Sequence, residues 1–496
     1  MHQVARRWGP QALVRRRGWT TVIDFGLIDE WTPAPGRVTT WSATPAAVTA
    51  ASAAPPHPVP ASYQQQAYLR AARRNENAGF RFSRLCLISF DIGGRLDVDA
   101  MTRTVNAFIR RHDTFLSWFD IDDDDTVTRH VIEPDGVELA PVDHGDFADS
   151  ESILAHVQTT TPGPFHWDCF TVGVIEHEND FTVYFAVDHL NSDGVSQALA
   201  CVDLISLYGS SVGGTEPALA PAGSYLDYCV RERDTGAALD ASDERVARWQ
   251  SLLSANGGSL PRFPLDLGVA EEGYTRSRIL TVPVLDGPAA DRVDAVCRAN
   301  GAGMTAGVLT VAGMVAHEIT GSSRYLGFTP KNTRMTPEEF NSVGWFTNLI
   351  PVTTDFGPDS SFTSLVGQTQ QSFDAGKALS EVSLHRVVEL IGDDAGIDVP
   401  EGWVVPMVSF IDVRKLPGAQ MFDHINGGVF GNRGSSEEVY LWVNRFPEYT
   451  VMTLLYPDTE TAAASIQQYV DRFTGVFSSI ATTGDYTPAA VSLAAR

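Results

Sequence analysis

The feature that most limits the fold of this chain is a break near its middle. Residues 208–225 read YGSSVGGTEPALAPAGSY, a stretch rich in Gly, Ser and Pro that is typical of a boundary between two folded parts. On each side of it, segments with helical spacing of apolar residues alternate with short runs typical of strands. A chain of 496 residues is also longer than one common domain. These features predict two α/β lobes of comparable size.

The predicted organisation has three parts. Residues 1–60 are expected to hold a basic tail, short strands and an Ala/Pro-rich linker, residues 61–215 the first lobe, and residues 216–496 the second lobe. The tail carries five arginines before residue 18 and no acid, but the apolar core of a signal peptide does not follow them. We therefore expect a flexible basic segment, with contact to a membrane surface as the alternative.

Charge and cysteine content argue against several classes of protein. The net charge of −25 disfavours a general surface for nucleic acid or anionic membranes. The five cysteines are odd in number, far apart and without CxxC spacing, which favours a reduced, cytoplasmic compartment. The closest candidate for a membrane span, GVLTVAGMVA from Gly307, stops at His317 and Glu318, so it predicts a buried helix.

A histidine motif follows a regular strand signal. In FTVYFAV (181–187) four apolar residues alternate on one face, and DHLNSDG (188–194) comes directly after it. A neutral imidazole at the end of a buried strand can remove a proton from a hydroxyl, since its ordinary pKa is about 6.5. His189 is therefore a candidate base, Asp193 can anchor the turn through a salt bridge, and Gly194 permits a tight backbone turn.

Three other patterns are expected to be structural. GSSVG (209–213) has the spacing of a hydrolase nucleophile elbow, but a helix pattern precedes Ser211 and a Pro-rich stretch follows it. DIDDDD (120–125) lacks the Gly and the bidentate Glu of a calcium loop, so it predicts a hairpin turn, and we expect no metal site in the chain. His112 lies on an apolar helical face, which favours a packed core residue over a catalytic one.

Several segments, in order along the chain, resemble one superfamily. DHLNSDG is similar to the HHxxxDG motif shared by condensation domains of nonribosomal peptide synthetases, chloramphenicol acetyltransferase, plant BAHD acyltransferases and actinobacterial polyketide-associated (Pap-type) acyltransferases. The resemblance covers roughly residues 60–480, and IDEWTPAPGRVTTW (28–41) is most similar to the polyketide-associated branch. It also rests on SYQQQAYL (62–69), AFIRRHDTFLSWF (107–119), the segment 297–334 that ends in KNTR, and VGWFTNLIPV (343–352).

The resemblance implies an α/β fold (an α+β sandwich) of two chloramphenicol-acetyltransferase-like lobes in a V, with an active-site tunnel between them. It makes His189 the catalytic base, and Asp193 a structural residue that pairs with an arginine of the second lobe. Arg334 is the candidate for this arginine and Arg324 the alternative. Asp188 stands where most condensation domains have a first histidine. We expect its side chain to point away from His189, because successive strand residues face opposite sides.

The implied activity is that of an O-acyltransferase. The enzyme would move an acyl chain from acyl-CoA or an acyl-carrier thioester, as co-substrate, to a hydroxyl of a glycolipid or other lipid alcohol, without a covalent acyl-enzyme or a permanently bound cofactor. We expect a monomer in the cytoplasm or at the inner face of the membrane, with a polyketide synthase or carrier protein as a partner and no nucleic acid. A stand-alone amide-forming condensation enzyme and a non-catalytic docking protein for a synthase remain open. Candidate tunnel residues are Trp345, Asn348, Asn444 and Arg445, for which core or strand-end packing is the alternative.

Overall fold

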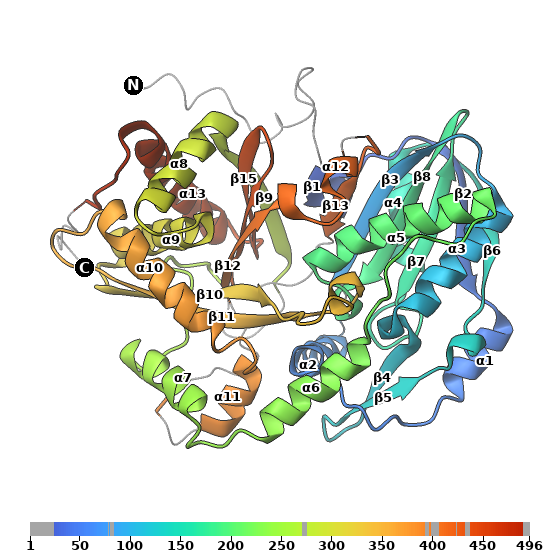
Figure 1. Cartoon of the computed structure of the whole chain (residues 1–496), viewed down its shortest axis with the longest axis horizontal. Coiled ribbons are helices and arrows are strands. Elements are labelled where there is room, and N and C mark those ends of the chain that lie inside the picture. The colour runs from blue at the N-terminus through green and yellow to red at the C-terminus, as the bar shows by residue number, and fades with distance from the viewer. Residues whose placement is uncertain are drawn as a thin grey trace.

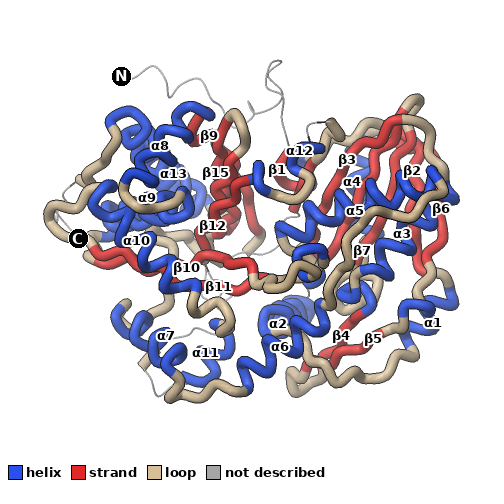
Figure 2. The backbone as a smooth tube through the Cα atoms, viewed as in Figure 1, coloured by secondary structure: helices blue, strands red, loops and turns tan. Residues whose placement is uncertain are grey.

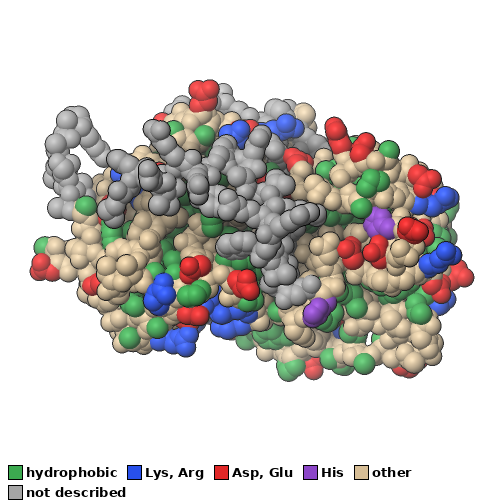
Figure 3. Space-filling model, turned by 90° about the horizontal axis from the view of Figure 1, so that it is seen from above, with side chains coloured by type: hydrophobic (Ala, Val, Ile, Leu, Met, Phe, Trp, Pro, Cys, Tyr) green, Lys and Arg blue, Asp and Glu red, His purple; other side chains and the backbone are tan. Residues whose placement is uncertain are grey.

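The chain forms two lobes, which lie side by side in Figure 1. The structure is a computed structural model that describes residues 24–77, 79, 84–269, 275–391, 396–397, 406–422, 424–431 and 437–489. The predicted basic tail lies outside the described residues. On the face seen in Figure 3, Lys and Arg side chains lie next to Asp and Glu side chains.

A seven-stranded mixed sheet forms the centre of the first lobe. In spatial order its strands are β1 (Asp24–Leu27), β13 (Gly428–Gly431), β3 (Leu85–Gly93), β8 (Asp180–Asp188), β7 (Phe170–Glu176), β2 (Gly36–Ala43) and β6 (Leu139–Phe147). The other elements of this half are α1 (Pro45–Ser52), α2 (Tyr63–Asn77), α3 (Val98–Arg111), the hairpin β4 (Ser117–Ile121) and β5 (Val127–Val131), α4 (Ser150–Thr160), the 3-10 turn η4 (His189–Asn191) and α5 (Gly194–Gly213).

The side chains of β8 alternate between the two faces of this sheet. The four alternating apolar residues of 181–187 pack in one core with α3 and α5. Tyr184 and Ala186 lie in a separate core on the opposite face, together with Ile153 and Val157 of α4. The alternation predicted from the sequence is therefore confirmed, and β8 ends at the histidine motif.

Helix α5 begins directly after that motif. Asp193 is its N-cap and accepts a hydrogen bond from the backbone N–H of Ser196 at 2.8 Å. The helix ends at Gly214, whose φ of 62° is the left-handed conformation that favours glycine. Ser211 thus lies inside a helix and not at a strand-to-helix elbow. Among the described residues, α5 is the one single helix long and apolar enough to cross a membrane. Half of the 18-residue apolar stretch that meets this criterion is buried in the protein.

The second lobe contains a four-stranded sheet and a separate two-stranded ribbon. In Figure 2 the ribbon of β10 and β11 extends from the second lobe toward the first. The sheet has the order β12 (Met407–Asp412), β14 (Tyr440–Arg445), β15 (Tyr449–Pro457), β9 (Ser277–Asp286), and the ribbon is β10 (Arg324–Asn332) with β11 (Thr347–Asp355). The helices of the second half of the chain are α6 (Tyr225–Ala237), α7 (Glu244–Ala255), α8 (Gly287–Ala299), α9 (Met304–Thr320), α10 (Phe362–Lys377), α11 (Leu384–Ile391), α12 (Ala419–Phe422) and α13 (Glu460–Thr483). Of these, α12 lies beside β1 and β13 (Figure 1), and its Phe422 packs in the core of the first lobe. The predicted buried helix after Gly307 is α9.

Three segments differ from the predicted organisation. β1 and β2, which fall within 1–60, are strands of the first lobe's sheet. The predicted linker is wrong for α1, because Thr44 caps a helix there, and the small side chains of Ala47 and Ala51 let it pack closely on the core. β13 comes from the second half but pairs with β1 and β3, so 216–496 does not form one lobe by itself. A four-residue strand is too short for its distant partners to be predicted from a local pattern.

The structural interpretations of two other patterns are confirmed. The four aspartates of 122–125 lie in the turn between β4 and β5, where Asp122 accepts hydrogen bonds from the N–H groups of Asp124 and Thr126, both at 2.9 Å. His112 is buried, with Nε2 3.0 Å from Asp203 and Nδ1 accepting from the backbone N–H of Val343 at 3.3 Å. Both nitrogens of His112 are therefore engaged within the core.

Candidate active site

The candidate catalytic turn follows β8 and is held at its first residue. The backbone N–H of His189 donates to the carbonyl of Arg84 at 2.8 Å. Asp188 is fully buried, and its carboxylate accepts a hydrogen bond from the N–H of Leu190 at 3.0 Å. The hydroxyl of Tyr68 also bonds to this carboxylate. Asp188 therefore holds the turn and helix α2, and these contacts agree with the expectation that it points away from the imidazole.

The imidazole of His189 lies where the two halves of the chain meet. Its ring centroid is 4.4 Å from that of Trp345, a residue of the second half. Nδ1 is buried without a hydrogen-bond partner, whereas the residue as a whole is only half-buried. Nε2 is therefore the ring nitrogen that a substrate can reach.

Burial lowers the pKa of His189 to about 4. The positive charge of Arg84 is the next largest cause, while the negative charge of Asp193 acts in the opposite direction with smaller effect. Trp345 contributes to this burial, and it packs edge-to-face with Tyr68 at 5.5 Å between ring centroids. At neutral pH the imidazole is uncharged and can accept a proton.

Asp193 is joined to the second half of the chain by a bidentate ion pair. Nη1 and Nη2 of Arg334 donate to its two carboxylate oxygens at 2.9 and 3.2 Å. The backbone N–H of Phe346 donates to the same carboxylate at 2.9 Å. Arg334 is therefore the arginine that reaches Asp193, whereas Arg324 lies 3.5 Å from Asp355. With its N-cap bond included, both oxygens of Asp193 are engaged away from the imidazole.

The buried guanidinium of Arg334 has several further partners. It donates to the carbonyls of Glu339 and Ser342, both at 3.0 Å, and to the hydroxyl of Ser196 at 2.8 Å. Its central carbon lies 4.2 Å from the ring centroid of Phe346. These contacts use the planar fork of arginine, which a lysine could not reproduce. The loop after β10 is thus fastened onto the first turn of α5.

Gly194 does not make the tight turn predicted from the sequence. It is the first residue of α5 and is not one of the glycines with positive φ. A Cβ added there would meet no atom within 4 Å. The chain instead turns through Ser192 and Asp193, which have extended backbone conformations. Gly194 therefore leaves open space beside the catalytic turn.

Two of the candidate tunnel residues are held by contacts within the second lobe. The side-chain amide of Asn348 donates to the carbonyl of Ser380 at 2.9 Å, and its oxygen accepts from the N–H of Leu349. Arg445 bonds to Asp291 and to the carbonyl of Ala290, both on α8. Trp345, by contrast, contacts His189 directly, and Asn444 has a buried side-chain oxygen without a hydrogen-bond partner.

Gln65 of α2, which was not predicted from the sequence, supports the catalytic turn. Its side-chain amide donates to the carbonyl of Leu190 at 3.1 Å. Its oxygen accepts from the N–H of Ser62 and from the fully buried guanidinium of Arg129, both at 3.2 Å. Gln65 and Tyr68 are three residues apart on α2 and so share the helix face toward the turn. Their spacing is the signal that could have identified this face.

Metal-ligating side chains do not cluster in the part of the chain that the structure describes, where no group of three or more His, Cys, Asp or Glu residues could hold an ion. The five cysteines are free and buried, and burial raises the pKa of the Cys86 thiol to about 12. A thiol so protonated is a poor nucleophile at neutral pH. The chemistry available at the lobe junction is therefore that of a neutral imidazole.

Two lobes with such a histidine at their junction, followed by an aspartate bonded to the other half, define a class of acyl-transfer enzyme. Residues 85–394 match the family model of the condensation domain, and the chain belongs to this family. It is 34% identical over 467 residues to the 2'-acyl-2-O-sulfo-trehalose (hydroxy)phthioceranyltransferase PapA1 of Mycobacterium tuberculosis (strain CDC 1551 / Oshkosh), which covers 93% of this chain and 89% of the relative.

A second relative and a solved structure agree. The chain is 35% identical over 451 residues to the trehalose-2-sulfate acyltransferase PapA2 of Mycobacterium bovis (strain BCG / Pasteur 1173P2), with 90% of this chain and 95% of the relative covered. A solved structure of PapA2 acyl transferase has a TM-score of 0.87 at 34% identity, covering 93% of this chain and all of that one. These likenesses confirm the Pap-type resemblance and the O-acyltransferase class predicted from the sequence.

Proposed function

We propose that the chain transfers an acyl group from a thioester to a hydroxyl of a glycolipid or other lipid alcohol, with His189 as the general base. The observation that carries the proposal is the environment of this imidazole. It lies at the lobe junction, its Nε2 is open to a ligand, and burial keeps it uncharged at neutral pH. A base of this kind can act directly on a bound hydroxyl.

In the proposed reaction, Nε2 of His189 removes the proton of the acceptor hydroxyl while the oxygen attacks the thioester carbonyl. The new C–O bond forms and the carbonyl oxygen becomes negative. When this intermediate collapses, the C–S bond breaks and the departing thiolate takes the proton back from the imidazolium. No covalent acyl-enzyme is formed. Holding donor and acceptor together in a tunnel between the lobes would supply much of the acceleration.

The names of the relatives support a sugar-based acceptor, since PapA1 and PapA2 are named for acylated or sulfated trehalose. The donor in the proposal is acyl-CoA or a carrier-bound chain, with no permanently bound cofactor. His189 and Trp345 come from the same chain, which supports a monomeric enzyme. We place the enzyme in the cytoplasm or at the inner face of the membrane, which five free, buried cysteines support. A synthase or its carrier protein would be the partner.

The test is thiol release from a series of acyl-CoA donors with alcohol and amine acceptors, followed by the intact mass of each product. We expect release that depends on a trehalose-based or lipid alcohol and an ester product. Faster reaction with matched amines and an amide product would favour a stand-alone condensation enzyme. Absence of turnover with every acceptor, for protein that is folded by circular dichroism, would favour the docking protein.

A further inference from the structure

A cavity of about 260 Å³ lies in the second lobe at a split between its two groups of strands. In the part of the chain that the structure describes, β10 pairs only with β11, and β12 pairs only with β14. Residues of both β10 and β12 line the cavity, which therefore lies between their two edges. The two strands lie near each other but are not hydrogen-bonded partners.

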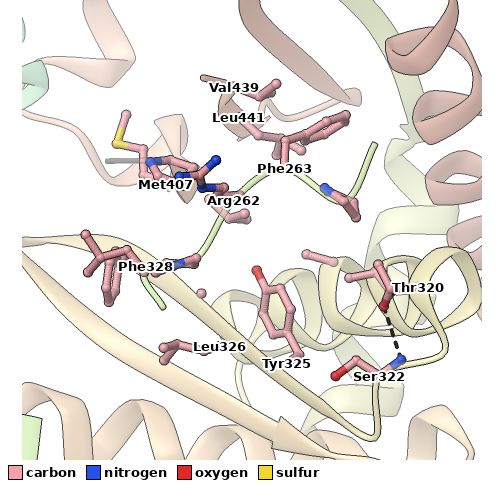
Figure 4. A pocket seen from close by; sticks show the side chains of 18 of the residues that line it. Arg262, Phe263, Thr320, Ser322, Tyr325, Leu326, Phe328, Met407, Val439 and Leu441 are labelled. Atoms are coloured by element: carbon pink, nitrogen blue, oxygen red, sulfur yellow. Dashed lines mark hydrogen bonds between the residues drawn. The ribbon is translucent and has the colours of Figure 1, made fainter. Parts of the chain in front are cut away.

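The wall of this cavity is largely apolar. Figure 4 shows Phe328 and Leu326 on one side, Met407 and Leu441 opposite them, and Tyr325 extending between them. Ala312 and Ala316 of α9 add small side chains to the wall. Apolar pockets with a few polar groups at one end are typical of sites for hydrophobic small molecules.

The charged side chains of the wall lie toward solvent. They are Arg262, which is exposed, and Arg324, whose side chain is one third exposed. Thr320 and Ser322 complete this polar rim. The wall contains no acidic side chain among the described residues. The cavity is thus suited to a hydrocarbon chain, and its described wall offers no carboxylate to a cationic ligand.

The wall that β12 and β14 form is linked to the catalytic turn through a short series of contacts. Met407 is paired in register with Tyr440, the residue between the wall residues Val439 and Leu441. The hydroxyl of Tyr440 accepts a hydrogen bond from Arg84 at 3.3 Å. The carbonyl of Arg84 in turn accepts the N–H of His189. Tyr440 and Arg84 therefore connect the wall strands β12 and β14 to the catalytic turn.

We propose that this cavity binds the hydrocarbon chain of the thioester donor, which enters past Met407 while the thioester remains at His189. The inference rests on the proposed function and adds the position of the chain. A methylene group needs about the space of one water molecule, about 30 Å³. The cavity therefore holds a segment of several chain carbons, and longer chains would extend past the rim at Arg262 into solvent.

The first test measures binding without turnover, by isothermal titration calorimetry with S-octyl-pantetheine and S-methyl-pantetheine. These thioethers carry the arm shared by CoA and carrier proteins. Each buried methylene strengthens binding about fourfold, and the octyl probe has seven more carbons than the methyl probe. Burial of only three of them should make the octyl probe bind at least ~60-fold more tightly. Ala316→Phe, which fills the cavity, should reduce this ratio to about threefold or less. The matched control is Ala295→Phe on an exposed position of α8, which should keep the wild-type ratio.

The second test covers the case in which Ala316→Phe does not fold, as judged by thermal unfolding. Met407→Ala enlarges the cavity and should shift the preferred chain of S-alkyl-pantetheines by two or more carbons toward longer chains. An octyl-to-methyl ratio that is equal in Ala316→Phe and Ala295→Phe, or an unchanged preference in Met407→Ala, would overturn the inference. Chain-dependent binding without any thiol release would contradict the proposed function but not the cavity, and release without chain-dependent binding would contradict the cavity alone.

Discussion

Arg334 and Asp193 form a bidentate ion pair between the two halves of the chain, with the Arg334 side chain fully buried and the Asp193 side chain 6% exposed. Asp193, the aspartate of the histidine motif, therefore joins the two lobes through this ion pair. It does not relay charge to His189, although the two residues are only four positions apart. The motif combines a reactive residue with the contact that fixes the loop after β10 on the first turn of α5.

Removing one partner of this pair should destabilise the protein strongly. Arg334→Met leaves the Asp193 carboxylate buried without its charge partner, which typically lowers the free energy of unfolding by about 3–5 kcal/mol. Urea unfolding followed by tryptophan fluorescence measures the loss. Arg324→Met is the control, because its partly exposed pair with Asp355 should be worth less than about 1 kcal/mol. Equal losses in the two variants would show that the pair does not join the lobes as described.

The pH dependence of catalysis should reflect the depressed pKa of His189. A base with a pKa of about 4 is unprotonated above pH 5.5, so kcat/KM should be constant from there to pH 8 and should fall only near pH 4. Arg84→Met removes a positive charge that lowers this pKa, so its acid limb should move to higher pH. An acid limb near pH 6.5 in the wild type would contradict the buried, neutral imidazole.

The same pKa shift predicts how stability changes with pH. The unfolded chain, with an ordinary histidine pKa of about 6.5, binds this proton more readily than the folded chain. The contribution of His189 to stability is therefore present above about pH 6.5 and is lost as the pH falls toward 4. Circular dichroism at each pH of the kinetic series separates this loss from the protonation of the base.

Asp188 should tolerate any replacement that keeps an acceptor for the turn. Asp188→Asn preserves an oxygen for the N–H of Leu190, and Asp188→His places the residue found in most condensation domains there, so both should retain most activity. Asp188→Leu leaves that N–H and the Tyr68 hydroxyl without their acceptor in a buried place, which should destabilise the protein by about 1–3 kcal/mol. Thermal unfolding and thiol release compare the three variants. Loss of most activity in a folded Asp188→His would show that the carboxylate has a role in catalysis.

Gly194→Ala should distinguish a structural glycine from one that leaves space for a ligand. A Cβ there meets no protein atom within 4 Å and the backbone is not strained, so the free energy of unfolding should not decrease. If a substrate approaches α5 at this point, KM should rise while the melting temperature stays the same. A lowered melting temperature would instead support the interpretation of Gly194 as a glycine that the backbone turn requires.

Local patterns predicted the elements around His189 because each depends on neighbouring residues. The alternation of 181–187 was enough to predict β8, and the motif was enough to predict a turn and the start of α5. The strand β13 could not be predicted in its sheet, since its pairing joins residues more than 300 positions apart in sequence. Gln65 and Arg84 were missed for the same reason, because both meet the catalytic turn through long-range hydrogen bonds. Arg445 lies at the end of β14, and its contact with Asp291 of α8 could not be predicted without the fold.

The most direct test of the central claim is thiol release by His189→Ala beside His166→Ala, an exposed histidine of the first lobe that serves as the matched control. If His189 is the general base, kcat/KM should fall by about 10²–10⁴-fold in His189→Ala, with an unchanged melting temperature and unchanged binding of S-octyl-pantetheine, while His166→Ala remains like the wild type. A folded His189→Ala with the wild-type rate would contradict the proposed mechanism.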